Sequence, residues 1–327
     1  MMWLSSRWVN PTHLSWRRMA TGDLLLFQGS EMMRNLKVIV FFLFFWVEWA
    51  LAFPVLVTTD WVAAHLDDKN IVLVDMAGDP NQYRRFHLPG AYYLPYGALV
   101  EKGRDGVARS ITEERLFRLL GNLGITESTH VLIYDDMGGL EASRLFWELE
   151  RVGHPQVSVI DGGLVRWILD GRPVVAEIPR VQPVVYRPSA GVSRRDNGID
   201  LATVKSAIGI PSVTFLDVRT PEEYQGDQRD KRSGHIPGAQ LWPWDQAVDF
   251  AGGFVLKSRE DLLASLGQSG IEQKELDLVL YCRSGHRAAQ TYLTLRHLGF
   301  ERLRLYEGSM AEYAKSPDVE LRHGATP

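Results

Sequence analysis

Residues 278–290 read LVLYCRSGHRAAQ. The apolar and aromatic run 278–281 predicts a buried strand, and the apolar spacing over 288–298 predicts a helix. The short loop between them begins with Cys282, contains Gly285 and carries two arginines, Arg283 and Arg287. In such a loop successive backbone N–H groups can form an anion-binding nest, and the positive end of the helix dipole points at the same place. Together these groups favour the thiolate of Cys282, which is the nucleophilic form of cysteine.

Cys282 is the single cysteine of the 327-residue chain. A free cysteine often serves only as a small buried hydrophobe, but a strand-to-helix turn flanked by two arginines favours a reactive thiol. Because the chain offers no partner for an intramolecular disulfide, the thiol stays free for chemistry even in an oxidising compartment.

Two further motifs accompany this loop. Upstream, FLDVRTPEEY (215–224) is followed by GHIPGA (234–239), and downstream LYEGSM (305–310) is followed by Tyr313. In this order the three motifs resemble the rhodanese family of sulfurtransferases, in which the loop cysteine carries sulfur as a persulfide. The resemblance implies that Asp217 and Arg219 lie at the base of the active site.

The motifs occur twice, at an offset of roughly 140–150 residues. VLVD (72–75) parallels FLD (215–217), HLPGA (87–91) parallels HIPGA (235–239), and VLIYD (131–135) parallels VLYC (279–282). The first copy therefore has Asp135 where the second has Cys282. A carboxylate cannot carry a persulfide and would repel an anionic donor, so we expect the first copy to be catalytically silent. The asymmetry resembles tandem sulfurtransferases, in which a degenerate N-terminal domain packs against an active C-terminal one.

Each copy alternates short β-rich runs with helical stretches, which predicts an α/β fold with a parallel sheet and helices on both faces. In the first copy we expect strands near 71–75, 131–134 and 157–160, and helices near 112–122 and 139–151. The expected organisation is a silent rhodanese domain over 54–180, a linker over 181–200 and a catalytic rhodanese domain over 201–327.

The amino terminus is predicted to be a targeting segment. Residues 33–52 combine Arg34 and Lys37, the apolar run VIVFFLFFWV and the cleavage site ALA, which together are typical of a secretory signal. Residues 1–32 match no part of the family and are expected to be a non-native extension. The mature protein would be exported, to the periplasm in a bacterium, without stable membrane association. An N-terminal membrane anchor and a cytoplasmic protein are the alternatives.

Composition is that of a soluble globular protein, with 45% hydrophobic residues, 23% charged residues and a net charge of −4. It gives no sign of a nucleic-acid partner. We expect a monomer that needs no cofactor or metal ion, and whose partners are a small anionic sulfur donor and a thiol or cyanide acceptor.

The expected reaction is a two-step transfer. The Cys282 thiolate attacks the outer sulfur of thiosulfate, sulfite leaves, and an acceptor then removes the sulfur from the persulfide. We expect the donor and the persulfide to be bound by Arg283, Ser284, Gly285, His286, Arg287 and Arg219, with Asp217 as structural support. For Arg219 a structural salt bridge is an equal alternative. His286 could be an acid–base group or a solvated loop histidine.

Three other functions remain open at this stage. Family members that use 3-mercaptopyruvate have small neutral residues after the cysteine, whereas Arg283 is typical of the thiosulfate type. A persulfide carrier or binding module without turnover would need the same loop. Cysteine-dependent phosphatases and arsenate reductases have a C-x5-R loop, whereas this chain has C-x4-R.

Overall fold

The structure, a computed structural model, describes residues 53–188 and 194–327. The expected signal (33–52) and extension (1–32) lie outside the described residues. In the described part of the chain, no helix combines the length and the apolar character that a membrane span requires.

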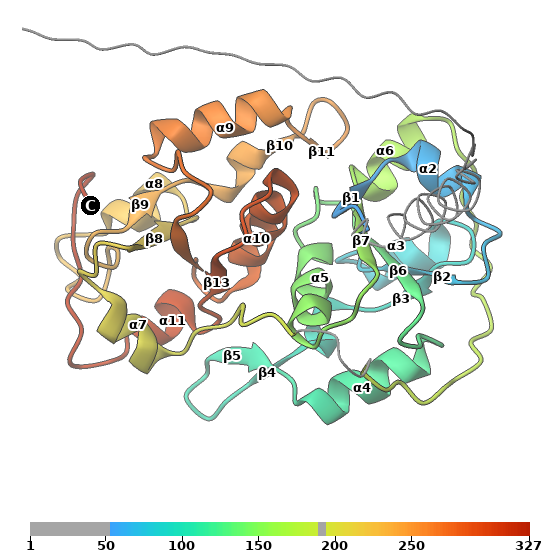
Figure 1. Cartoon of the computed structure of the whole chain (residues 1–327), viewed down its shortest axis with the longest axis horizontal. Coiled ribbons are helices and arrows are strands. Elements are labelled where there is room, and N and C mark those ends of the chain that lie inside the picture. Colours follow the sequence, from blue (N-terminus) through green and yellow to red (C-terminus); the bar gives the residue numbers. More distant parts are fainter. Residues whose placement is uncertain (1–52, 189–193) are drawn as a thin grey trace, which may run out of the picture. The chain divides into compact units, whose positions relative to one another are not determined.

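The first repeat is built on a sheet with strand order β1-β7-β6-β2-β3, in which every pair of neighbours is parallel (Figure 1). Its elements are β1 (Leu56–Val57), α2 (Thr59–Ala64), β2 (Ile71–Asp75), α3 (Pro80–Arg85), β3 (Tyr92–Tyr93), the 3-10 turn η1 (Tyr96–Ala98), β4 (Val100–Lys102), β5 (Ala108–Ser110), α4 (Glu113–Asn122), β6 (His130–Tyr134), α5 (Ala142–Arg151), β7 (Val157–Ile160) and α6 (Gly163–Leu169). β4 and β5 form a separate antiparallel hairpin.

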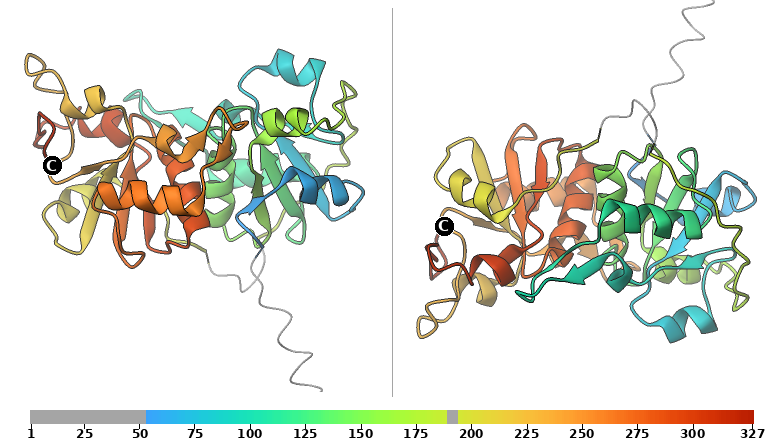
Figure 2. Two further views of the ribbon diagram at one scale, coloured as in Figure 1. Left: turned by 90° about the horizontal axis from the view of Figure 1, so that it is seen from above. Right: turned by 90° about the horizontal axis from the view of Figure 1, so that it is seen from below.

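The second repeat has a parallel sheet with strand order β13-β12-β8-β9. Its elements are α7 (Leu201–Ala207), β8 (Val213–Asp217), α8 (Pro221–Gln225), β9 (Gln240–Leu241), η2 (Trp244–Ala247), β10 (Val248–Asp249), β11 (Val255–Leu256), α9 (Arg259–Gln268), β12 (Asp277–Tyr281), α10 (His286–Leu298), β13 (Leu303–Leu305) and α11 (Ser309–Tyr313). Helices flank both sheets, as Figure 2 shows. The predicted α/β class, with a parallel sheet in each repeat, is confirmed.

The two repeats match down to single hydrogen bonds. Tyr134 ends β6 opposite Asp75, and Tyr281 ends β12 opposite Asp217. The Tyr134 hydroxyl accepts a bond from the Leu88 N–H at 3.1 Å, and the Tyr281 hydroxyl accepts one from the Ile236 N–H at 3.2 Å. Asp135 and Cys282 are therefore the first residues after equivalent strands, as the sequence repeat predicts.

The strands predicted near 71–75, 131–134 and 157–160 are present, but two helix boundaries differ. The helix predicted over 139–151 begins at Ala142, because the preceding residues close a loop around the Asp135 carboxylate. The helix predicted from residue 288 begins at His286. Both differences lie at the loops that follow the central strands, where periodicity carries the least information.

The repeats share one buried apolar cluster, within which α5 and α10 pack against each other (Figure 1). A partly buried ion pair also joins the repeats, since the Arg144 guanidinium on α5 contacts the Glu307 carboxylate. Ser110 on β5 supports this pair by donating its N–H to Glu307 at 2.7 Å. Arg144 also pairs with the fully buried Glu148 on its own helix at 3.0 Å, so Glu307 extends an ion pair of the first repeat across to the second.

Candidate active site

Cys282 lies at the carboxyl end of β12, the position where parallel α/β sheets bind ligands, and its exposed fraction is 1%. Ser309 at the start of α11 fixes the loop that follows. Its hydroxyl accepts hydrogen bonds from the N–H groups of Cys282 and Gly285, both at 3.1 Å, and donates to the Tyr306 carbonyl. Sequence reasoning missed this role, although the closing motif contained Ser309.

The loop leaves a set of backbone donors unused. Among the described residues, no acceptor is paired with the N–H groups of Arg283, Ser284, His286, Arg287 or Ala288. Some of these belong to the first turn of α10, where helix geometry offers no internal acceptor. The candidate site thus contains free N–H donors directly after the sulfur-bearing residue.

In the first repeat Asp135 itself binds four N–H groups of the corresponding loop. Its Oδ1 accepts the N–H groups of Met137 and Gly139, both at 2.9 Å, and its Oδ2 accepts those of Glu141 at 2.7 Å and Ala142 at 3.0 Å. Burial raises the pKa of Asp135, and the four N–H donors act in the opposite direction. The first loop is therefore a nest that holds its own anion.

Asp217 and Arg219 form a closed structural pair beneath the loop. The Arg219 Nε lies 2.9 Å from Asp217 Oδ1, and its terminal nitrogen also donates to the Gly234 carbonyl at 2.9 Å. In the first repeat Ala77 occupies the place of Arg219, and burial there raises the pKa of the counterpart Asp75 to about 6. Arg219 was expected either to contact the substrate or to form a structural salt bridge, and these contacts favour the salt bridge.

The two loop arginines differ in their surroundings. The Arg287 guanidinium makes two hydrogen bonds to the Glu223 carboxylate, at 2.6 and 2.9 Å. Burial raises the pKa of Glu223, but this pairing outweighs burial and leaves it below the ordinary value. Arg283 is exposed, and its side chain makes no ion pair or hydrogen bond with any described residue. Arg283 is thus the loop cation that is free to meet a substrate.

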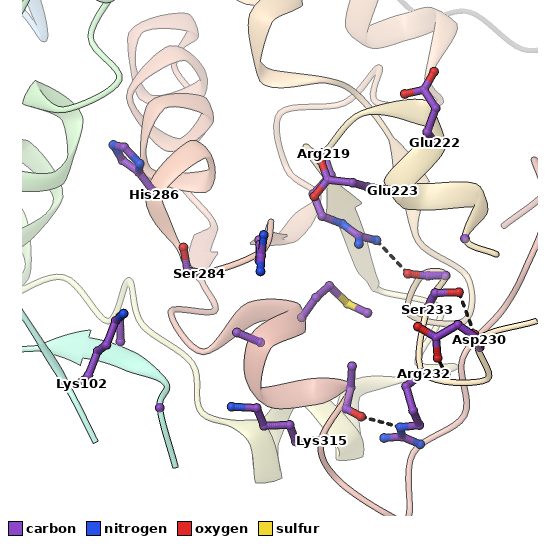
Figure 3. Close-up of a pocket in the computed structure, with 18 of the residues that line it drawn as sticks. Lys102, Arg219, Glu222, Glu223, Asp230, Arg232, Ser233, Ser284, His286 and Lys315 are labelled. Carbon is purple, nitrogen blue, oxygen red and sulfur yellow. Dashed lines mark hydrogen bonds between the residues drawn. The ribbon is translucent and has the colours of Figure 1, made fainter. Parts of the chain in front are cut away.

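A cavity of about 1500 Å³ opens beside the loop and is lined by both repeats. Arg283, Ser284 and His286 line it from the second repeat, and Figure 3 shows Glu222, Glu223 and Asp230 on the side opposite His286. The first repeat contributes Tyr96 from η1 and Lys102 from the β4–β5 hairpin. The sequence did not indicate that residues of the first repeat line the cavity, because their position there depends on how the two repeats pack against each other.

The surroundings of His286 differ from those of a solvated loop histidine. The exposed fraction of its side chain is 25%, and its Nε2 lies 3.2 Å from Oε2 of Glu141 in the first repeat. The centroid of its ring also lies 4.3 Å from that of the Tyr96 ring.

Within the described residues, no cluster of His, Cys, Asp or Glu side chains is suited to hold a metal ion.

A family model described as the rhodanese-like domain matches the chain twice, over residues 58–170 and 200–316. The chain belongs to the rhodanese family. The resemblance inferred from the sequence motifs is therefore confirmed, with one family domain in each repeat.

The alignments with curated relatives cover almost the whole length of those relatives. The "Sulfur carrier protein TtuD" of Thermus thermophilus is 34% identical over 286 residues, covering 83% of this chain and 97% of the relative. A protein of Mycobacterium leprae named "Putative thiosulfate sulfurtransferase" is 31% identical over 284 residues, covering 83% of this chain and 98% of the relative.

Solved structures have a fold similar to that of this chain over most of its length. YnjE superposes with a TM-score of 0.71 at 21% identity, covering 83% of this chain and 68% of YnjE. The anaerobic ergothioneine biosynthesis enzyme from Chlorobium limicola gives a TM-score of 0.71 at 22% identity, covering 83% of this chain and 70% of that enzyme. At such identities the likeness concerns the fold alone.

Proposed function

We propose that this protein is a sulfurtransferase that moves the outer sulfur of thiosulfate to a thiol or cyanide acceptor through a persulfide on Cys282. The observation that supports this most is the contrast between the two nests. The first nest is filled by the Asp135 carboxylate, whereas the second has free N–H donors beside a cysteine.

The chemistry of the two side chains explains the contrast. In aspartate the carboxylate oxygens lie one atom beyond Cγ, and in a cysteine persulfide the outer sulfur lies one atom beyond Sγ. A bare thiol is one atom shorter and leaves the donors unpaired, whereas a persulfide anion would carry its charge to the place that the carboxylate oxygens occupy in the first repeat. Fixed N–H donors stabilise such an anion without reorganisation during the reaction.

The proposed steps balance without a cofactor. The Cys282 thiolate attacks the outer sulfur of thiosulfate, the S–S bond of thiosulfate breaks, and sulfite leaves with the bonding electrons. The acceptor then attacks the outer sulfur of the persulfide, and the Cys282 thiolate is restored. Because Asp135 replaces the cysteine and fills its own nest, we propose that the first repeat performs neither step.

We propose different roles for the two loop arginines. Arg283, which is free, would bind the sulfonate oxygens of thiosulfate through charge-assisted hydrogen bonds. Arg287 is held by Glu223 and would act on the Cys282 thiolate through its charge, because the two groups interact electrostatically. In this proposal Ser284, Gly285 and His286 supply loop N–H groups, and Arg219 with Asp217 supports the loop from below.

The proposed function predicts a defined covalent intermediate. Incubation with thiosulfate should raise the intact mass of the protein by one sulfur atom, and addition of cyanide should restore the original mass while thiocyanate forms. Intact-mass spectrometry with a colorimetric thiocyanate assay measures both. Cys282→Ser is the control that should acquire no sulfur. A wild-type protein that stays unloaded at saturating thiosulfate would refute the function.

Donor preference is predicted to depend on Arg283. A charge-assisted hydrogen bond contributes roughly 1.5–3 kcal/mol, so Arg283→Gln should lower kcat/KM for thiosulfate by about ten- to a hundredfold. The dianion thiosulfate should lose more than 3-mercaptopyruvate, which carries one carboxylate. Steady-state kinetics with both donors test this, and Arg302→Gln, an exposed arginine at the opposite edge of the sheet, is the matched control. A larger loss with 3-mercaptopyruvate would identify that compound as the donor.

A carrier without efficient turnover is the second candidate, and the relative named a sulfur carrier protein favours it. A carrier would be loaded by thiosulfate in the mass experiment but would release sulfur slowly to cyanide. The rate of thiocyanate formation therefore separates the two functions.

A further inference from the structure

His286 projects from the second repeat against the first. It is the first residue of α10, four positions after Cys282, and its side chain lies between Glu141, in the loop before α5, and Tyr96 on η1. Figure 3 shows the His286 side chain at the edge of the cavity that faces the first repeat. A silent repeat thus supplies a carboxylate to a histidine at the start of the catalytic helix.

The two nitrogens of the His286 ring have different surroundings. Nε2 and the Glu141 Oε2 are both buried and lie 3.2 Å apart, in an ion-pair contact whose orientation is not that of a hydrogen bond. Nδ1 makes no hydrogen bond with any described residue. Unlike Nε2, it is not a buried atom, so it is accessible to solvent. His286 also lines the cavity together with Arg283 and Ser284. A carboxylate beside Nε2 favours the tautomer with the proton on Nε2, which leaves Nδ1 as a proton acceptor.

We propose that His286 is the general base that deprotonates a thiol acceptor, and that Glu141 is the residue that positions it. This inference rests on the proposed sulfurtransferase function and specifies its acceptor half. It gives the silent repeat a part in the reaction with thiol acceptors.

The acceptor half needs a base that the donor half does not need. Thiosulfate reacts as an anion and its attack by the Cys282 thiolate moves no proton. An alkyl thiol such as cysteine, with a pKa of about 8.5, is mostly protonated at neutral pH and must lose its proton before it can attack. The demand for proton removal therefore falls on the second step alone.

The proposed step is balanced in atoms and charge. The thiol S–H proton passes to His286 Nδ1, the new thiolate attacks the outer sulfur of the Cys282 persulfide, and the bond between that sulfur and Sγ breaks. Its electron pair returns to Sγ, the acceptor leaves as a persulfide, and His286 returns the proton to that product. Glu141 keeps the imidazole oriented and stabilises the imidazolium formed in between.

The test compares two acceptors in one buffer, after the enzyme has been loaded by thiosulfate and freed of excess donor. Mercaptoethanol must lose a proton before it attacks, whereas sulfite, whose reaction reverses the loading step, attacks as an anion. For His286→Gln, the ratio of the mercaptoethanol rate to the sulfite rate should fall tenfold or more, because general-base catalysis typically contributes about 10²–10⁴-fold. Loss of the persulfide mass in single-turnover samples gives both rates.

Two further variants sharpen the result. Glu141→Gln should lower the same ratio to a smaller extent, and it keeps the test available if His286→Gln folds poorly. His297→Gln makes the same substitution at an exposed position near the end of α10 and should leave the ratio unchanged. Equal losses with both acceptors, or no loss with either, would overturn the role of His286. Failure of the wild-type protein to load would refute the sulfurtransferase function itself.

Discussion

Cys282→Asp should abolish sulfur transfer and at the same time raise the free energy of unfolding by about 1–3 kcal/mol. Aspartate at this position removes the nucleophile, so no persulfide can form. Its carboxylate would accept hydrogen bonds from the free N–H donors of the loop, as Asp135 does in the first repeat. The nearby Arg287 would add a favourable charge. The inactive protein should therefore be more stable than the active one.

Urea denaturation followed by circular dichroism measures the change in stability, and the thiocyanate assay measures the activity. Cys282→Ser is the matched control, because serine removes the nucleophile but places no acceptor among the donors. It should be equally inactive, with a free energy of unfolding close to that of the wild type. If Cys282→Asp were less stable than Cys282→Ser, the loop donors would not form an anion site.

Asp135→Ala should lower the free energy of unfolding by about 3–5 kcal/mol, the largest loss of stability that we expect. It removes the acceptor of four backbone N–H groups, and each buried donor without a partner costs about 1–3 kcal/mol. The total stays below a simple sum because Met137, at 40% exposure, gives water some access to the loop. Urea denaturation at neutral pH gives the value.

Asp136→Ala is the control for this prediction. Asp136 is the adjacent carboxylate, but it accepts no hydrogen bond from a described residue. Its removal should change stability far less than removal of Asp135. Similar losses for the two variants would mean that charge near the loop, and not the four hydrogen bonds, stabilises the first repeat. Asp135→Cys should be destabilised too and should acquire no sulfur, because the loop residues 136–140 (DMGGL) include no arginine.

The sequence was enough to predict the parallel sheets and the correspondence of Asp135 with Cys282, because both follow from local pattern and internal repetition. It could not predict the partner of Arg287, since Glu223 approaches from a helix far away in the chain. Tyr96 and Glu141 were missed for a stronger reason. Their contacts with His286 exist only once the two repeats are packed together, and no motif in the first repeat encodes that packing.

In the proposed mechanism, the single cysteine of this chain has a kinetic consequence. A second cysteine near Cys282 could attack the loaded sulfur site, close a disulfide and expel the cargo as hydrogen sulfide. With a single cysteine in the sequence, that internal discharge is impossible. The loaded protein must wait for an encounter with an outside molecule, so its lifetime is set by the supply of acceptor. In the proposed mechanism each chain would therefore hold a labile sulfur atom in reserve and would release it only to a molecule that can enter the cavity.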